Sequence, residues 1–540
     1  MDYYADLRVF LKALEQRGEL LHWNSPIDKD SELIPLYRLQ FRGLDETQRK
    51  AFLFKQVTGA KGLHYDMSVV AGCYGASDDI FALGMGCERP DEIYEKWHQA
   101  VSRPINPVIV ESGPVQEEVH LGPEIKELGL DELPAPVEEP GFSGSIRTTT
   151  PWITRDPDTG VRNMGNYSGH FRARDRIQCG INPVSHTMLH HWRSACRAGK
   201  PLPAAIIVGV TPNLVVAACT KVPYGVDELA VAGGISGKPV ELVKCKTVPL
   251  EVPANAEIVI EGEISADIRE PYAAFGEYPG YMMGETWSTP VMKITAITHK
   301  KNALFTPLVV GFPPGDSNLI GRLCNGMLMY EFLKYGCRLP VQDVYYHTMG
   351  GSHNFLVIRM KKTYPSQPWD ILHAAASTNP ACKWLIAVDE DINPRDLDMV
   401  TWALSYSMQP REDMQVISHR VARLDPSGAL PSRPGDPQES FPGAMGASAV
   451  MIDATRKKPY PPVGLPGKKY MDRAVALWEK EGLPQLKLRS PWYGYELGRW
   501  TEDDEENAQL LVRGEYLKVG EKMEKRQTRV TENRASNAKE

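Results

Sequence analysis

The sequence lacks several features that mark particular protein classes. Its longest apolar stretch, residues 204–219, contains Pro212 and Asn213 and is too interrupted to span a bilayer. Its nine cysteines form no C-x-x-C pair, and an odd, unpatterned number is typical of reduced thiols in a cytoplasm. The net charge of −7 gives no broad basic surface, and residues 2–17 are charged throughout, unlike a signal peptide. We therefore expect a cytoplasmic protein with no membrane span and no nucleic-acid partner.

Signatures of several common enzyme classes are also missing. The chain has neither the G-x-S-x-G elbow of serine hydrolases nor a G-x-G-x-x-G dinucleotide loop. Residues 233–239 favour a plain turn over a phosphate loop, because Pro239 stands where a Ser or Thr would bind magnesium. His186 and His190 have the i,i+4 spacing of zinc ligands on a helix, with His191 beside them, but no H-E-x-x-H motif is present. Spacing alone favours ordinary surface or core histidines.

Glycine and proline are abundant instead, with 45 and 43 residues. Proline at this density interrupts long helices, so we expect many strands, turns and loops. The hydrophobic share of 42% and the charged share of 24% are those of a soluble globular protein, most simply an enzyme. A length of 540 residues corresponds to roughly three or four domains.

Local patterns predict individual elements. Residues 7–14 place four apolar side chains on one face of a helix that Asp2 can cap and Gly18 ends. Val291–Ile297 and Ala303–Val310 flank a Lys-Lys-Asn turn and predict a β-hairpin.

The order of these patterns predicts the domains. Prolines and acids gather between residues 111 and 140, where we place a boundary. Strand patterns dominate from about 145 to 312 and indicate a β-rich middle domain. From 317 strands and helices alternate, which indicates an α/β domain, and the charged segment after 501 predicts an exposed helix.

One motif stands out as a candidate for acid–base chemistry. Residues 275–281, Phe-Gly-Glu-Tyr-Pro-Gly-Tyr, place Glu277 between glycines and aromatic rings. Such surroundings remove water from a carboxyl group and raise its pKa, which suits a general acid. The alternative is a turn at a strand end with an exposed glutamate.

Several short motifs occur in one order between residue 6 and about residue 480. They are Asp6–Leu21, Asn163-Met-Gly-Asn-Tyr167, Gly225-Val-Asp-Glu228, Phe275-Gly-Glu277 with Gly280-Tyr281, Val388-Asp-Glu-Asp-Ile392, Gln409-Pro410 with Asp413, and Ile452-Asp-Ala-Thr455. In order and spacing together, the chain resembles the UbiD family of decarboxylases.

The resemblance implies a mixed α/β and α+β multidomain fold. With the local patterns it predicts an N-terminal α/β region over residues 1–115 and a split β-barrel, like that of flavin reductases, over 116–315. A C-terminal α/β oligomerisation domain would cover 316–465, and a helical extension and tail 466–540. It also implies a homo-oligomer, dimeric or hexameric, with a C-terminal helix packed on a partner subunit.

The resemblance further implies prenylated FMN as cofactor, supplied by a separate flavin prenyltransferase. Its phosphate would be held through a divalent cation, Mn²⁺ or Mg²⁺ or else Fe²⁺, with K⁺ nearby. The family's metal ligands correspond to Asn163, His186 and Glu228, a set that suits a hard cation, and Tyr167 and Ser168 join the cofactor site. His190 is a rival to His186, because the spacing from Tyr167 differs slightly from that of relatives.

The Glu–Arg–Glu network that many relatives carry beside the flavin is incomplete here. Its second Glu corresponds to Glu277, the expected proton donor, but Tyr272 replaces the first Glu and Ser168 the Arg. Tyr272 and His170 are therefore expected in the substrate pocket. His170 and Arg172 could replace part of the missing charge, since both lie close to Ser168 in sequence.

The implied activity is non-oxidative decarboxylation of an aromatic carboxylic acid, with a role in the degradation of aromatic compounds. The chain also resembles one UbiD-like branch, phthaloyl-CoA decarboxylase, whose subunits have about this size and which forms benzoyl-CoA and CO₂. The altered network agrees with this resemblance, because an electron-withdrawing thioester could stabilise a flavin adduct without the usual charges. One alternative is decarboxylation or reversible carboxylation of a free aromatic or heteroaromatic acid. Others are a flavin reductase-like oxidoreductase with unmodified FMN and a cofactor-binding protein without turnover.

Overall fold

The computed structural model describes residues 3–181, 187–283, 288–421, 424–428 and 447–528. The chain divides into two compact units, residues 1–404 with 409–454 (unit 1) and residues 405–408 with 455–540 (unit 2). Each is described by itself. Among the helices of the described ranges, none has an apolar stretch long enough to cross a membrane.

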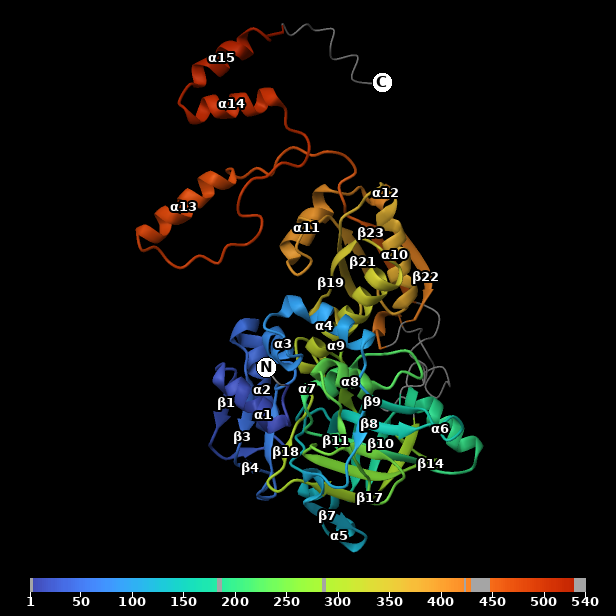
Figure 1. Ribbon diagram of the computed structural model, residues 1–540. Coiled ribbons are helices and arrows are strands. Elements are labelled where there is room, and N and C mark those ends of the chain that lie inside the picture. The colour runs from blue at the N-terminus through green and yellow to red at the C-terminus, as the bar shows by residue number, and fades with distance from the viewer. Residues whose placement is uncertain (1–2, 182–186, 284–287, 422–423, 429–446, 529–540) are drawn as a thin grey trace. The chain divides into compact units, whose positions relative to one another are not determined.

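Unit 1 begins with a helix packed beside a small sheet (Figure 1). Helix α1 (Leu7–Gln16) buries the four apolar residues of its predicted face. The predicted cap at Asp2 is wrong, because Asp6 has extended backbone and its side chain accepts a hydrogen bond from the Val9 amide at 2.9 Å. The sheet has the order β1 (Leu20–Trp23), β3 (Ala51–Phe54), β5 (Ser68–Ala71) and β18 (Leu304–Phe305). The accompanying elements are α2 (Leu33–Gly43), α3 (Asp78–Gly84), α4 (Ile93–Ser102), β2 (Ile27–Asp28) and β4 (Val57–Thr58).

The predicted hairpin between residues 291 and 310 is wrong. The first segment is β17 (Ser288–His299), but β18 pairs in parallel with β5, with Leu304 opposite Ser68. Both edges of β17 are already occupied, by β14 on one side and by β7 and β10 on the other. The chain therefore leaves the barrel at the turn, where Asn302 adopts a positive φ of 50°.

The middle of unit 1 is a closed β-barrel. Six strands follow the order β10-β9-β8-β11-β14-β17, and β10 pairs with β17 to close the ring. Trp152, Ile206 and Ile260 are fully buried on these strands. The predicted β-rich middle domain is therefore present. The strands are β8 (Arg147–Arg155), β9 (Arg162–Ala173), β10 (Arg176–Gly180), β11 (Leu202–Val208), β14 (Ile258–Pro271) and β17, with β7 (Glu118–Leu121) added along β17.

Shorter elements connect the barrel to its surroundings. They are α5 (Pro123–Glu127), α6 (Thr187–Arg197), α7 (Pro212–Cys219), α8 (Glu228–Ser236), β6 (Val108–Ile109), β12 (Glu241–Lys244), β13 (Glu251–Pro253), β15 (Phe275–Gly276) and β16 (Met282–Met283).

The last part of unit 1 alternates strands and helices, as predicted. Long helix α9 (Asp316–Tyr330) continues as a wider turn to Gly336 and leads into a sheet of order β19-β20-β21-β23-β22. Strands β20, β21 and β23 are parallel, which fits their continuous apolar runs. The elements are β19 (Val341–Tyr346), β20 (Phe355–Met360), α10 (Gln367–Thr378), β21 (Trp384–Val388), α11 (Leu397–Tyr406), α12 (Pro410–Asp413), β22 (Met414–Arg420) and β23 (Ala447–Asp453).

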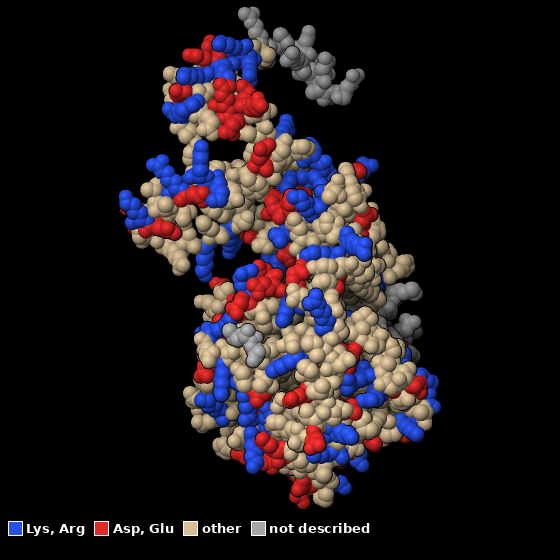
Figure 2. Space-filling view, in the orientation of Figure 1, with Lys and Arg blue, Asp and Glu red and all other residues tan. Residues whose placement is uncertain are grey.

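Unit 2 contains helices α13 (Lys468–Lys480), α14 (Glu502–Val512) and α15 (Tyr516–Glu524). The predicted exposed helix after residue 501 is thus two helices, which turn at Gly514 with a φ of 78°. Charges hold the pair together, since Lys522 contacts Asp503 at 3.1 Å and Glu506 at 2.7 Å. The acidic start of α14 and the basic side chains around it are visible in Figure 2.

Candidate active site

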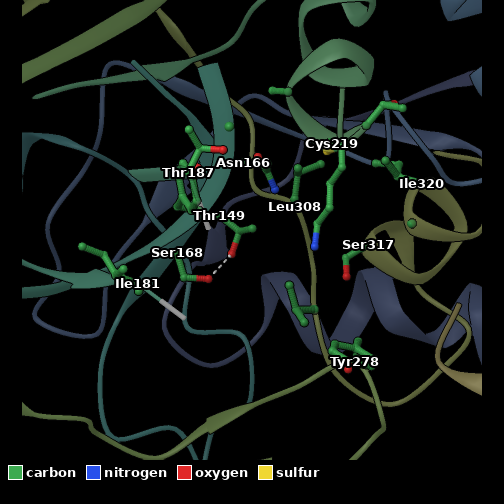
Figure 3. A pocket seen from close by; sticks show the side chains of 18 of the residues that line it. Thr149, Asn166, Ser168, Ile181, Thr187, Cys219, Tyr278, Leu308, Ser317 and Ile320 are labelled. Atoms are coloured by element: carbon green, nitrogen blue, oxygen red, sulfur yellow. Dashed lines mark hydrogen bonds between the residues drawn. The ribbon is translucent and has the colours of Figure 1, made fainter. Parts of the chain in front are cut away.

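A cavity of about 450 Å³ opens in unit 1 beside the barrel. Strands β8 and β9 line one side, where Thr149, Asn166 and Ser168 project, and α9 lines the other with Ser317 and Ile320 (Figure 3). The end of α7, the loop to α8 and residues 275–278 complete the wall. This volume is in the range of small-molecule and cofactor sites.

Two of the three predicted metal ligands lie together in this cavity. Asn163 is buried on β9, and Glu228 is the first residue of α8, whose N-cap is Asp227. The Met164 amide donates to Glu228 Oε2 at 3.0 Å and so fixes α8 against β9. Asn163 Nδ2 donates to the Tyr167 hydroxyl at 3.2 Å, which commits its amide nitrogen and leaves Oδ1 to meet a ligand. Tyr167 also lines the cavity.

These donors fit a hard cation. The burial of Glu228 raises the pKa of its carboxyl to about 7, so the site favours a positive partner for the ionised form. One carboxylate and one amide oxygen match the oxygen-rich ligation of Mg²⁺ or Mn²⁺. Asn166 adds a buried Oδ1 that has no hydrogen-bond partner among the described residues and also borders the cavity.

The histidines have separate positions. His186 lies outside the described residues. Its rival His190 is exposed on α6 and does not line the cavity, so the structure does not place it with the other metal ligands. His191 is buried in the core, with Nδ1 2.9 Å from Thr154 Oγ1, which agrees with the alternative of a core histidine.

Glu277 follows a short β-bridge and faces the cavity. Strand β15 pairs with β16, and the turn between them is closed by the Gly280 amide, which donates to the Glu277 carbonyl at 2.8 Å. Gly280 has a φ of 92°, a conformation that favours glycine. The backbone therefore forms the turn that was the alternative prediction. The glutamate is not exposed as that alternative required, because its carboxyl group is half-buried and lines the cavity. Burial raises the pKa of Glu277, and the positive charge of Arg147 opposes that rise.

A buried ion pair that the sequence analysis missed lies behind Glu277. Arg147 Nη2 contacts Glu138 Oε2 at 2.6 Å, and both side chains are almost fully buried. Arg147 Nη1 also donates to the Gly276 carbonyl at 2.9 Å, while the Gly276 amide donates to Glu139 at 3.2 Å. The carbonyl and the amide of Gly276, the residue before Glu277, are thus each fixed by a hydrogen bond. Glu138 and Glu139 lie in the proline- and acid-rich segment that we interpreted only as a boundary.

The residues at the altered family positions form a neutral part of the wall. Ser168 Oγ lies 3.1 Å from Thr149 Oγ1 (Figure 3), and Tyr272 is buried and borders the cavity. His170 lies behind this wall, with its ring centroid 4.9 Å from that of Tyr272, and burial lowers its pKa well below the ordinary value. Arg172 donates to the Pro271 carbonyl.

Neither His170 nor Arg172 borders the cavity, so the structure does not bring them to the site as sequence proximity suggested. Tyr272, by contrast, is buried and borders the cavity.

Other lining residues carried no motif that would have identified them. Lys221 follows α7 and borders the cavity just before the Gly225–Glu228 motif. Asn325 on α9 contacts His353 Nδ1 at 3.1 Å, and both border the same cavity. They come from three distant parts of the chain, so only the fold brings them together.

Comparison with known proteins follows the three parts of unit 1. Models of the N-terminal, Rift-related and C-terminal domains of 3-octaprenyl-4-hydroxybenzoate carboxy-lyase match residues 11–101, 107–313 and 318–454. The chain belongs to the UbiD family. An uncharacterised protein from Aquifex aeolicus is 30% identical over 452 residues, which are 78% of this chain and 88% of the relative. The predicted resemblance is confirmed.

Solved structures of UbiD-class enzymes share the fold. An evolved dimeric form of HmfF from Pelotomaculum thermopropionicum, in complex with prFMN, is 27% identical and has a TM-score of 0.75 over 88% of this chain and 100% of its own. The 3,4-dihydroxybenzoic acid decarboxylase AroY of Klebsiella pneumoniae is 26% identical, with a TM-score of 0.74 over 90% of this chain and 97% of its own. The UbiD-family chain is therefore a carboxy-lyase of the prenylated-FMN-dependent class.

Proposed function

We propose that this UbiD-family chain decarboxylates an aromatic carboxylic acid with prenylated FMN in the cavity of unit 1. The single observation that carries the proposal is Glu277, a half-buried carboxyl group with a raised pKa that lines the cavity containing Asn163 and Glu228. HmfF contains prFMN, and AroY acts on 3,4-dihydroxybenzoic acid, which supports both the cofactor and the substrate class.

The cofactor supplies an electron sink. Loss of CO₂ from an aryl carboxylate leaves an electron pair that is too unstable alone, and prenylated FMN, when bound, accepts it. The chain's own residues do the rest. Asn163 and Glu228, with the predicted His186, would hold a divalent cation for the flavin phosphate, with K⁺ nearby, and Glu277 would give a proton to the carbon that has lost CO₂. A separate flavin prenyltransferase supplies the cofactor.

The proposed substrate is phthaloyl-CoA, converted to benzoyl-CoA. The support is the neutral wall at Ser168 and Tyr272, where many relatives carry an Arg–Glu pair. A thioester beside the carboxylate withdraws electrons and lessens the need for that pair. A second candidate is a free aromatic or heteroaromatic acid, which the named substrate of AroY favours. A flavin reductase activity has less support, because the matching family models are those of a carboxy-lyase.

Cofactor analysis and a substrate panel test the proposal. The chain is co-expressed with a flavin prenyltransferase and purified without oxygen, and the bound flavin is identified by mass and absorbance. CO₂ release is then measured with phthaloyl-CoA and with free benzoic acids. Prenylated FMN and CO₂ release support the decarboxylase. Unmodified FMN with NADH oxidation would overturn it, and activity on free acids alone would overturn only the thioester substrate.

Glu277→Gln tests the proton donor. The amide has nearly the same shape but cannot supply the acidic proton, so turnover should fall by at least about 10²-fold while the bound flavin is retained. Glu263→Gln, at an exposed position on β14, is the matched control and should leave turnover unchanged. Equal CO₂ release from both variants would remove Glu277 from this role.

A further inference from the structure

Three potential metal ligands converge at the end of the barrel near β7 and α5, away from the α9 side that lines the cavity (Figure 1). They are His120 on β7, Glu132 at the end of a short turn (Gly129–Glu132), and His299, the last residue of β17. None of the three borders the cavity.

The strand register brings the two histidines together. Strands β7 and β17 are antiparallel, with His120 opposite Ile297 and Glu118 opposite His299. His120 and His299 are therefore diagonal neighbours on the same face of the sheet, within reach of each other's long side chains. Glu132 is brought to them by its turn, in which Leu130 is buried and its amide donates to the Arg174 carbonyl at 3.0 Å.

The distances suit a tetrahedral ion. The two Nε2 atoms are 3.3 Å apart. Zinc bound to two imidazoles at about 2.0–2.1 Å in tetrahedral geometry requires a separation of about 3.3 Å. Glu132 Oε2 lies 3.7 Å from His120 Nε2 and 4.0 Å from His299 Nε2, so a small rotation of the carboxylate completes the ligand set.

The hydrogen bonds orient the ligands as metal sites require. His299 Nδ1 lies 2.8 Å from the Lys300 carbonyl oxygen. Because a carbonyl can only accept a hydrogen bond, Nδ1 carries the proton, and the Nε2 lone pair of this tautomer is left to bind a metal ion. Glu132 is 9% exposed, and its Oε1 is buried with no hydrogen-bond partner among the described residues. A buried carboxylate oxygen without a partner is costly, and a bound cation removes that cost.

We propose that His120, Glu132 and His299 bind a zinc ion, with water as its fourth ligand, at a site separate from the flavin cavity. Two imidazoles and one carboxylate suit Zn²⁺ better than Mg²⁺ or Ca²⁺, which prefer oxygen ligands alone. The side chain of His120 is 26% exposed, which leaves an entry path for the ion and room for water. The ion would fasten β7 and the turn at residue 132 to the barrel strand β17.

Zinc content tests the proposal directly. The full-length chain is prepared in a Glu228→Gln background, without flavin prenyltransferase, so that the cavity's predicted cation site is removed. After chelator treatment it is incubated with a slight excess of Zn²⁺, passed through gel filtration and analysed for metal. The parent should retain one zinc per chain, and His120→Asn and Glu132→Gln should lose it. Added zinc should raise Tm only in the parent.

The matched control is His373→Asn, because His373 is exposed on α10 and belongs to no such cluster. This variant should keep the zinc. If His120→Asn fails to fold, the zinc content of Glu132→Gln tests the site, because this substitution preserves the shape of the side chain. Absence of zinc from the parent, or equal zinc in the parent and Glu132→Gln, would overturn the proposal in favour of a metal-free hydrogen bond between the two imidazoles. The readout is metal content, so the result is independent of the decarboxylase assignment.

Discussion

At the scale of single residues, the chemistry depends on how Glu277 is held. The Gly276 carbonyl accepts from Arg147 and the Gly276 amide donates to Glu139, so the peptide before Glu277 is fixed on both sides. Burial and Arg147 act on the Glu277 pKa in opposite directions. Arg147 is thus placed to position Glu277 and to set how readily this proposed proton donor ionises.

Removing this charge should change the pH profile. In Arg147→Met/Glu138→Gln the buried pair loses both charges. Arg147 lowers the pKa of Glu277 more than Glu138 raises it, so the loss of both leaves a net increase. The pKa of Glu277 then rises. A general acid works only while protonated, so the fall of kcat/KM at high pH should move to higher pH.

Arg17→Met/Glu88→Gln removes an exposed pair of the same residue types, joined at 2.8 Å, and should leave the pH profile unchanged. The profile of each variant is measured with the best substrate of the panel. An unchanged high-pH limb in Arg147→Met/Glu138→Gln would contradict the electrostatic role and leave Arg147 a structural residue.

The single variant Arg147→Met should be much less stable than the double variant. It leaves Glu138 charged and buried at 3% side-chain exposure, and loss of one partner of a buried pair costs about 3–5 kcal/mol. Denaturant unfolding of the wild type, the single variant and the double variant measures this difference. Equal stability of the two variants would show that Glu138 is not left unpaired.

At the scale of elements, sequence patterns correctly predicted the helices and strands that depend on the spacing of neighbouring apolar residues. Strands β20 and β21 lie in the part of the chain where alternating strands and helices were predicted, because each is a continuous apolar run buried in a parallel sheet. Helix α1 likewise follows its apolar spacing. The hairpin after β17 failed because strand pairing depends on which edges distant strands have already taken.

The same limit applies to the site. Glu277 and Asn163 lie in recognisable motifs and do line the cavity. Arg147 and Glu138 carry no motif, and their importance comes from a contact with Gly276, 129 residues away along the chain from Arg147. Sequence proximity misplaced His170. It lies two residues after Ser168 on β9 and so shares its face, but its ring packs against Tyr272 and Phe275 and does not border the cavity.

Helix α9 carries a pH-sensitive group of its own. Asp316, its first residue, is buried and accepts a hydrogen bond from the Tyr37 hydroxyl, and burial raises its pKa to about 7. In the unfolded chain an aspartate titrates near about 4. The folded state therefore retains a proton that the unfolded state loses, and stability falls as pH rises from about 4 to about 7.

Asp316→Asn should remove this pH dependence. The amide keeps an acceptor for Tyr37 and cannot ionise, so its stability advantage over the wild type should grow from about pH 5 to about pH 8, by roughly 3 kcal/mol. Thermal unfolding of both proteins across that range measures it. Asp66→Asn, at an exposed position, is the control, and its stability should change with pH as that of the wild type does. A constant difference between Asp316→Asn and the wild type would contradict the assignment.

At the scale of the whole molecule, the cavity and the family matches can be assigned to unit 1. The described residues that line the cavity fall within unit 1, and the three family matches end at residue 454. Helix α13 of unit 2 carries an apolar face but buries none of its described side chains. The residues of that face are Tyr470, Met471, Ala474, Val475, Leu477 and Trp478.

An unburied apolar helix face of this kind is suited to a second copy of the chain, and the family resemblance predicts a homo-oligomer with a C-terminal helix on the partner. Leu477 is 51% exposed, and a charge there would have to be buried in the interface. Leu477→Glu should therefore lower the mass measured by light scattering from a multiple of 60.2 kDa toward 60.2 kDa itself.

Ala476→Glu adds the same charge on the opposite face of α13 and should leave the oligomer intact. The comparison separates an interface from a general effect of charge, because the two substitutions differ only in which side of the helix they reach. Dissociation by both variants would mean that α13 is destabilised rather than that its apolar face is buried. A wild-type mass of 60.2 kDa would exclude self-association through this helix.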